Sequence, residues 1–516
     1  MKRKLSEMTT RIFAPCARAV ALLLAVAATA GAWAVETMPE QARTAAQNWI
    51  RRNPNRMQAS FKSWNAKPPR TIKDADGRAI YHVVDMADGG FVVTSGDTRI
   101  DPIIAFSSSG DYNSAEGSPL EALLAGDQKR RLELVHNVQG TVPSDKDASK
   151  AVSSDAQSSA EAQWAYLLED DALGKDAASG DSSISDVRVP ALLATQWDQS
   201  TWGNYSNTPN VYNYYTPNNY VCGCVATAGA QIMKYWEYPS SVDSFTGTCT
   251  VDGVYTTLTS LGGAFAWDKM PLSFSDTPNP TLEQRQAIGK LTYNVGVAVE
   301  MDYTAKESGA NTPYLTSQLR SRFGYASGVF VWFFREVGSS SSVIDFQNAL
   351  YASLDAGMPV SMSIGGLEGG RSIGHSIVAD GYGYSSNKRY THLNMGWSGL
   401  DDIWYNVPDE TLTDRYKFDT IRGLGINIHP YAQGDVISGR VLNSGGAPVS
   451  GATVKLFSSS GAQIASTNSN SRGIYSFRVT SAGSYSLSAQ RGASSSESAY
   501  AYRSRDSMGN RKMDFE

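Results

Sequence analysis

Apolar residues recur with a helical period in several stretches of the chain. The clearest stretch is Cys224–Trp236, which is followed by Pro239, and a proline at this place favours the end of a helix. Its apolar face recurs mostly at intervals of three or four residues and consists of Val225, Gly229, Ile232, Met233 and Trp236. Helices are also predicted over 43–52, 161–173, 282–297 and 343–356.

Alternation of apolar and polar residues, a period of two, predicts strands. The segment 79–112 divides into strands at Gly-Asp and Ser-Gly turns. Further along the chain, strands are expected over 359–364, 375–382, 390–395 and 404–407. From Gly434 onward, short alternating strands are separated by turn residues roughly every 8–12 positions, which is typical of a small β-sandwich that folds on its own core.

Changes in composition divide the chain into a leader and three further parts. The expected limits are 1–34, 35–186, 187–432 and 433–516. The stretch 145–189 is rich in Ser, Asp and Ala, and its end, 175–190, has the character of an exposed linker that a protease can cut. Residues 187–432 are dense in aromatic side chains and contain every candidate for chemistry.

The leader has the three regions of a secretory signal peptide. Basic residues from Lys2 to Arg18 are followed by the apolar run 19–32, and Ala32-Trp33-Ala34 is a small-residue signal for cleavage after Ala34. A membrane anchor is the alternative, but the apolar run is short for a span. No other stretch is long and apolar enough to cross a membrane, so we expect a secreted, extracellular protein without a membrane span.

Bulk composition narrows the class of protein. Hydrophobic residues make up 41% of the 516 residues and charged residues 18%, which indicates a globular chain rather than a disordered one. The formal net charge of −5 is small for this length, so nothing in the charge favours a nucleic-acid partner.

Three cysteines remain after the signal peptide is removed: Cys222, Cys224 and Cys249. Cys224 would begin the predicted helix, where the free backbone N–H groups and the positive end of the dipole favour a thiolate. A buried structural cysteine is the alternative interpretation. A zinc site needs more ligands than these cysteines supply, so we expect no metal and no cofactor. A Cys222–Cys249 disulfide would leave Cys224 free, and the sequence leaves this bridge open.

A cysteine nucleophile needs a base, and the chain has five histidines. His375 follows a glycine-rich stretch and precedes an apolar strand, and it lies 375 − 224 = 151 residues after Cys224. That separation is close to the roughly 130–150 residues expected between Cys and His in papain-like peptidases. The order Cys, His, Asn is completed by Asn394.

Three motifs together resemble the streptopain family of papain-like cysteine peptidases: "GCVATAGAQIMKYWEYP", "GHSIVADGYG" and "HLNMGWSG". The resemblance covers about residues 35–430, because "GGFVVTSGDTRIDPIIAFSSSGDY" also looks like the propeptide of that family. It implies an α+β fold: a two-lobed, papain-like peptidase with an N-terminal propeptide. The part 433–516 is similar to carboxypeptidase-regulatory-like domains, which are small all-β sandwiches.

The same resemblance implies the roles of the site residues. Cys224 is expected to be the nucleophile, His375 the general base and acid, and Gln199 the side-chain donor of the oxyanion hole. The family usually has tryptophans on both sides of the glycine after the asparagine, but here Met395 stands before Gly396. The group that orients His375 is therefore open, and its candidates are Asn394, which strand alternation favours, and Trp397.

The sequence thus predicts a secreted cysteine endopeptidase that is made as a zymogen and cleaves proteins or peptides through an acyl-enzyme. Its own propeptide would be an intramolecular inhibitor, removed by cleavage between about Asp170 and Gln196. Two alternatives belong to other classes. One is a cell-wall amidase with the same Cys/His pair, and the other is a non-enzymatic adhesin that uses the C-terminal sandwich.

Overall fold

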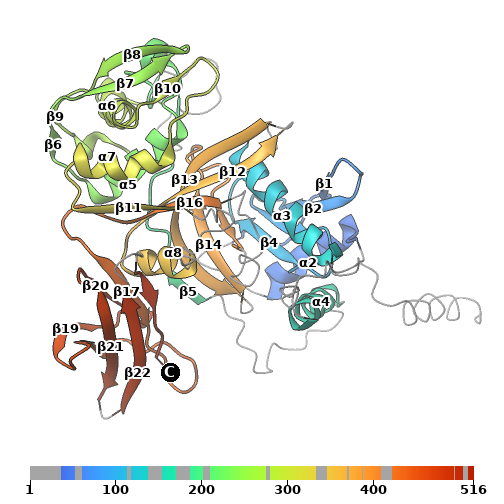
Figure 1. The fold of residues 1–516 in the computed structure, drawn as a ribbon. Coiled ribbons are helices and arrows are strands. Elements are labelled where there is room, and N and C mark those ends of the chain that lie inside the picture. Colours follow the sequence, from blue (N-terminus) through green and yellow to red (C-terminus); the bar gives the residue numbers. More distant parts are fainter. Residues whose placement is uncertain are drawn as a thin grey trace, which may run out of the picture.

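The computed structural model describes most of the chain (Figure 1). The described residues are 36–52, 61–112, 118–137, 154–169, 186–200, 210–274, 279–332, 346–368, 371–385, 388–407, 421–492, 494–503 and 509–515. The expected signal peptide, 1–34, and most of the expected linker, 175–190, lie outside these residues. Figure 1 shows a lobe of helices and short strands beside a long central sheet, with an all-β region at the C-terminus.

An 11-stranded sheet runs through the middle of the molecule. Its order is β1-β2-β3-β4-β15-β14-β13-β12-β16-β11, and β5 also pairs with β13. The strands that follow β4 in this order, together with β5, form what we call the sheet lobe. They are β5 (Asp186–Val189), β11 (Ser327–Trp332), β12 (Val360–Glu368), β13 (Arg371–Ser385), β14 (Lys388–Asn394), β15 (Ile403–Tyr405) and β16 (Ile421–His429). The four strands predicted between 359 and 407 are therefore confirmed as β12 to β15.

The N-terminal region, residues 36–169, supplies the other strands of the same sheet. Its elements are α2 (Pro39–Arg52), β1 (Arg70–Lys73), β2 (Ala79–Asp85), β3 (Phe91–Ser95), β4 (Ile103–Ser107), α3 (Pro119–Asn137) and α4 (Ser154–Leu168). Strand β4 pairs with β15, with Trp404 opposite Phe106 and Tyr405 opposite Ala105. One apolar core contains buried side chains from both sides of this junction, among them Leu124 and Met362. The N-terminal region and the sheet lobe thus share a sheet and a core.

The helical lobe lies on the other side of the sheet lobe and is built around α5 (Cys224–Trp236), α6 (Leu282–Ala298) and α7 (Thr312–Ser321). Helix α5 has the limits that the sequence predicts. Thr281 caps α6: its hydroxyl accepts from the Gln284 N–H, and the Gln284 side chain accepts from the Thr281 N–H. The smaller elements are η1 (Pro217–Asn219), β6 (Ser241–Val242), β7 (Thr246–Val251), β8 (Val254–Thr259), β9 (Gly263–Ala264), η2 (Trp267–Lys269) and β10 (Asp302–Tyr303).

The C-terminal region, residues 434–515, consists of two sheets. The strands β20 (Ile474–Val479), β17 (Asp435–Arg440) and β23 (Arg511–Lys512) form one, and β19 (Gln463–Asn468), β18 (Thr453–Ser458), β21 (Gly483–Arg491) and β22 (Ser494–Arg503) form the other. Buried and partly exposed residues alternate along β18 and β21, so each strand turns one face to a core that includes Leu456, Phe477 and Leu487. Helix α8 (Phe346–Asp355) of the sheet lobe packs against β17 and β23.

The α+β fold with two lobes and a C-terminal all-β region is confirmed. Two helices were not predicted, α3 and α7, and α4 begins earlier than expected. In α7 only Leu315 and Leu319 are buried apolar residues, which is too few for a clear periodic pattern. The limits of the domains stay a prediction. Among the described residues, no helix is both long and apolar enough to cross a membrane.

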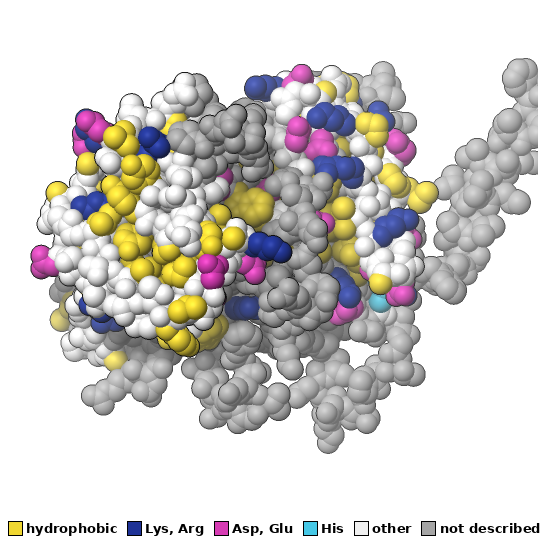
Figure 2. Space-filling model, turned by 90° about the horizontal axis from the view of Figure 1, so that it is seen from above, with side chains coloured by type: hydrophobic (Ala, Val, Ile, Leu, Met, Phe, Trp, Pro, Cys, Tyr) yellow, Lys and Arg dark blue, Asp and Glu magenta, His cyan; other side chains and the backbone are white. Residues whose placement is uncertain are grey.

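The surface seen in Figure 2 is divided between hydrophobic and charged side chains. Hydrophobic side chains gather over the helical lobe, while acidic and basic side chains are mixed over the N-terminal region (Figure 2). Exposed apolar residues of the helical lobe include Val254, Tyr255, Leu272, Leu282 and Tyr314. No single sign of charge dominates this face of the described surface.

Candidate active site

Cys224 is the first residue of α5, at the boundary between the helical lobe and the sheet lobe. Gly223 precedes it with φ 89°, a conformation that favours glycine. A Cβ atom at Gly223 would lie only 2.6 Å from the Met301 Sδ, so a larger residue would clash as well as strain the backbone. The glycine therefore lets the chain turn sharply into the helix and places the thiol at the positive end of the helix dipole.

The Cys224 thiol hydrogen-bonds to the imidazole of His375 on β13. Burial alone would raise the pKa of Cys224, but the charge and hydrogen bond of His375 outweigh burial and lower it. Backbone N–H groups of Ser376 and Val225 also hydrogen-bond to the sulfur and lower its pKa further. Conversely, burial would lower the pKa of His375, but Cys224 raises it. Both shifts favour a thiolate beside an imidazolium.

Two groups of the segment after β14 lie against the His375 ring. The backbone carbonyl oxygen of Met395 is 3.4 Å from Nε2 of His375, and the Trp397 ring meets the imidazole edge-to-face at a centroid distance of 6.3 Å. The sequence prediction took only the side chain of Met395 into account, and the group that lies beside the ring is its main-chain carbonyl.

Asn394 does not occupy the orienting place that strand alternation favours for it. Its Oδ1 accepts from Gln231 Nε2 at 2.9 Å, and its Nδ2 donates to the Thr195 carbonyl at 2.8 Å. Its Oδ1 also accepts from the Gly396 N–H at 3.1 Å. These bonds turn the buried amide toward α5 and the segment before Gln199, and none of them reaches His375. Asn394 therefore joins the two lobes beside the site.

Gln199 lies next to the turn that carries the nucleophile. Its backbone carbonyl accepts from the Cys222 N–H at 2.8 Å. Asp198 holds the same segment, because one carboxylate oxygen accepts from the Gln199 N–H and the other from the Ser398 hydroxyl, each at 2.6 Å. Burial raises the pKa of Asp198, and these two hydrogen bonds oppose that shift. Asp198 thus links the segments of Gln199 and Trp397, a role that its sequence motif, "WDQS", did not reveal.

The other two described cysteines are different in kind from Cys224. Cys222 and Cys249 are buried free thiols, so the structure contains no bridge between them. Burial raises the pKa of Cys222 to about 12 and that of Cys249 to about 11. Cys222 contacts the Thr227 hydroxyl at 3.3 Å. Of the three, only Cys224 has a lowered pKa, which singles it out for nucleophilic chemistry.

Buried Asp380 and the partly buried Asp402 and His392 form a group that supports the segment that contacts His375. Asp402 accepts from the Met395 N–H at 2.8 Å, and His392 Nδ1 lies 2.6 Å from Asp380. Burial raises the pKa of Asp402 to about 7 although His392 and the Met395 N–H lower it. Burial would lower the pKa of His392, but Asp380 raises it. No trio of His, Cys, Asp or Glu among the described residues is arranged to hold a metal ion.

Three family profiles match successive parts of the chain. The profile of the peptidase C10 family matches residues 197–405, that of the Spi protease inhibitor family matches 34–130, and that of the carboxypeptidase regulatory-like domain matches 436–503. Streptopain of Streptococcus pyogenes is 25% identical over 348 residues, which is 63% of this chain and 73% of that protein. The thiol protease/hemagglutinin PrtT of Porphyromonas gingivalis is 25% identical over 324 residues, which is 61% of this chain and 32% of that protein.

Among solved structures, a fragment of prointerpain A from Prevotella intermedia covers 71% of this chain and is itself covered completely. Its sequence identity is 18% and its TM-score is 0.47.

Trp397→Ala is expected to lower kcat by roughly 10- to 100-fold with little change in KM, because the imidazole loses the ring that limits its orientation. Trp397→Phe should restore part of the rate, since a phenyl ring can also meet the imidazole edge-to-face. Asn394→Ala should instead lower the free energy of unfolding by about 1–3 kcal/mol, because Gln231 and Thr195 lose buried partners. Steady-state kinetics and thermal unfolding of the three variants separate orientation from stability. A larger kcat loss in Asn394→Ala than in Trp397→Ala would contradict these assignments.

Asp402→Asn is expected to change how stability depends on pH. The folded-state pKa of Asp402, about 7, is above its ordinary value of 3.8, so its protonation stabilises the fold fully below pH 3.8. That contribution is lost as the pH rises from 3.8 to about 7. The Tm of Asp402→Asn relative to the parent protein should therefore increase between pH 5 and pH 8. Asp268→Asn, at an exposed position, is the control and should show no such trend. Both changes are made with Cys224→Ser to prevent self-digestion, and equal trends would contradict the assignment.

Proposed function

Because this chain is a cysteine peptidase of the C10 family, we propose that Cys224 and His375 are its catalytic pair and that it is secreted as a zymogen. The observation that carries this proposal is the thiol–imidazole contact at the start of α5, with the two pKa values shifted toward the ion pair. The substrate class is proteins and peptides.

Acylation begins with attack of the Cys224 thiolate on the carbonyl carbon of a peptide bond. The C–S bond forms and the carbonyl electron pair moves to oxygen, which becomes an oxyanion. The Gln199 side chain and the Cys224 backbone N–H are the proposed donors to this oxygen, each worth on the order of 3 kcal/mol in transition-state stabilisation. The position of Gln199, whose backbone carbonyl binds the Cys222 N–H, supports this role.

Collapse of the tetrahedral intermediate breaks the C–N bond while the His375 imidazolium gives its proton to the leaving amine. The product is a thioester, and His375 is left neutral. A water molecule then attacks the thioester carbon, and His375 takes the proton of the water. Release of the carboxylic acid returns the thiolate–imidazolium pair, so the cycle balances without a metal or a redox partner.

The N-terminal region is the proposed intramolecular inhibitor. It adds β1 to β4 to the sheet of the peptidase, and α3 packs on β12. Arg131 of α3 is buried, and its guanidinium donates to the Asn406 side chain at 3.0 Å and to the Asn406 carbonyl at 2.6 Å. The Ser118 hydroxyl donates to Asp401, next to the carboxylate that supports Met395. The N-terminal region thus contacts Asp401 and Asn406, which follow the segment of Met395 and Trp397 along the chain.

Cys224→Ser is expected to lower kcat/KM on a fluorescent casein substrate by on the order of 10⁴-fold or more and to leave a folded, full-length precursor. Cys222→Ser should keep most of the activity, because a buried thiol with a pKa of about 12 is not a nucleophile near neutral pH. Iodoacetamide at pH 6 should label Cys224 of the mature protein and leave Cys222 and Cys249 unlabelled. Normal cleavage by Cys224→Ser together with inactivity of Cys222→Ser would mean that the nucleophile is misassigned.

Arg131→Ala is expected to speed maturation and raise residual precursor activity, by roughly 10-fold, because two charge-assisted hydrogen bonds to Asn406 are lost. Lys129→Ala, an exposed position on the same helix, is the matched control. The readout is the time course of precursor conversion on a gel together with the rate on a short peptide. Identical courses for the two variants would show that this contact does not contribute to latency.

A further inference from the structure

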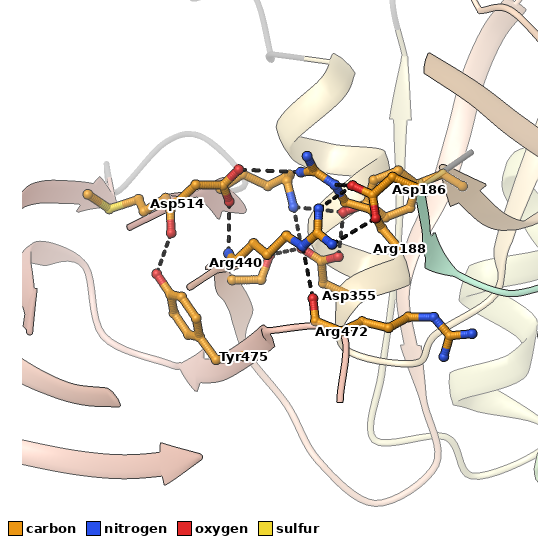
Figure 3. Close-up of polar contacts among 11 residues, drawn as sticks. Asp186, Arg188, Asp355, Arg440, Arg472, Tyr475 and Asp514 are labelled. Atoms are coloured by element: carbon orange, nitrogen blue, oxygen red, sulfur yellow. Dashed lines mark hydrogen bonds and ion pairs between the residues drawn. The ribbon is translucent and has the colours of Figure 1, made fainter. Parts of the chain in front are cut away.

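The C-terminal region covers one strand of the peptidase, β5, which begins at Asp186. Arg440 of β17 has a buried side chain, and its two terminal nitrogens bind the two carboxylate oxygens of Asp186 (Figure 3). The second of these bonds is 2.7 Å long. A paired contact of this kind is specific for a carboxylate, because the planar guanidinium matches both oxygens at once. The Arg440 Nε is used as well, since it donates to the Arg472 carbonyl at 2.8 Å.

The next two residues of β5 also meet this surface. Arg472 Nε donates to the Val187 carbonyl at 3.0 Å, so the C-terminal region also binds the backbone of the strand. Arg188 Nη1 lies 3.4 Å from Oδ2 of Asp514, and the guanidinium carbon of Arg188 lies 4.4 Å from the centroid of the Tyr384 ring. Three consecutive residues of β5 are therefore held by their side chains or backbone.

The opposite edge of β5 is paired with β13. Asp186, Val187 and Val189 lie opposite residues 382–384 of β13. A Cβ atom at Gly383 would lie 2.7 Å from the Asp186 carbonyl oxygen, and one at Gly381 would lie 2.9 Å from the Val189 carbonyl oxygen. The two glycines of "DGYGY" therefore allow β5 to approach closely, and the strand is enclosed between β13 and the C-terminal region.

The C-terminal region is itself anchored firmly to the sheet lobe. The Asp355 side chain is 0% exposed, and it accepts from the Tyr382 hydroxyl, the Ser438 hydroxyl and the Lys512 ammonium. Asn510 adds hydrogen bonds to Ser353 and Asn427, at 3.2 and 3.0 Å. A buried carboxylate without partners is costly, so these contacts are expected to persist and to fix the C-terminal region on the sheet lobe. Arg440 and Arg472, which belong to this region, are thereby held beside β5.

We propose that the C-terminal region is an interaction surface whose partner is the strand β5. The contacts of Arg440 and Arg472 with this strand, here called the clamp, set the site of maturation on the N-terminal side of Asp186. A peptidase takes its substrate as an extended segment with a free backbone, and the backbone of β5 is already bound on both edges. The clamp thereby excludes the later part of the expected cleavage range, 170–196, and keeps the new N-terminal strand attached after the cut. The statement about maturation rests on the proposed function, whereas the clamp itself does not.

Limited trypsin digestion tests the clamp independently of the peptidase activity. The bond between Arg188 and Val189 lies inside β5, so in full-length Cys224→Ser protein it should resist trypsin. Adding Asp186→Asn and Arg472→Met should speed cleavage at this bond on the order of tenfold, since cleavage follows the opened fraction of the strand. Arg491→Met is the matched control, because Arg491 binds the Gly451 carbonyl instead. Intact mass identifies the fragment that begins at Val189. If the double change lowers the Tm, the same comparison is made with Asp186→Asn alone.

Sequencing of the new N-terminus tests the boundary. Full-length Cys224→Ser protein incubated with a trace of active enzyme should yield a chain that begins at or before Asp186. A chain that begins anywhere within 187–196 would overturn the boundary, and cleavage of the unmodified β5 as fast as in the double variant would overturn the clamp. If the protein has no peptidase activity, the proposed function fails, while the trypsin result still decides on the clamp.

Discussion

The site depends on a charge pair that must form between two partly buried side chains. The Cys224 thiol and the His375 imidazole come from different lobes, and each favours the charged form of the other against the effect of burial. Such a pair tolerates little displacement, because its free energy changes steeply with distance at low dielectric. The surrounding polar contacts therefore cross the boundary between the lobes. Asn394 with Gln231, and Asp198 with Ser398, are the two clearest examples.

The contact between His375 and Met395 explains how the site accommodates an unusual residue. Every residue type has a main-chain carbonyl, so this contact with His375 does not require a particular side chain at position 395. The methionine side chain is buried in the core of the sheet lobe with Leu393 and Ile403. The orientation of the ring is then shared between the carbonyl and the Trp397 ring, and the carbonyl is held in turn through the Met395 N–H by Asp402.

Periodicity and motif order predicted the scaffold of this site, and the structure brings together Cys224 and His375, the two residues that the motifs pair. The limits of α5 and the strands β12 to β15 follow from local patterns, because apolar faces of regular elements repeat at fixed intervals. Long-range polar contacts leave no such pattern. The role of Asn394, the support from Asp198 and Asp402, and the capture of Asp186 by Arg440 depend on which segments meet in space. Strand alternation favoured Asn394 as the orienting residue, because it describes the directions of side chains and could not indicate that a backbone atom of Met395 contacts the histidine.

The junction between β4 and β15 has a consequence for the activated protein. Once β1 to β4 are removed, β15 becomes an edge strand with unpaired N–H and C=O groups, beside apolar side chains that the N-terminal region had covered. Such an edge is a template for pairing with another chain, and short edge strands limit this hazard. Strand β15 spans only Ile403–Tyr405. Its length thus restrains self-association at the moment when activation uncovers it.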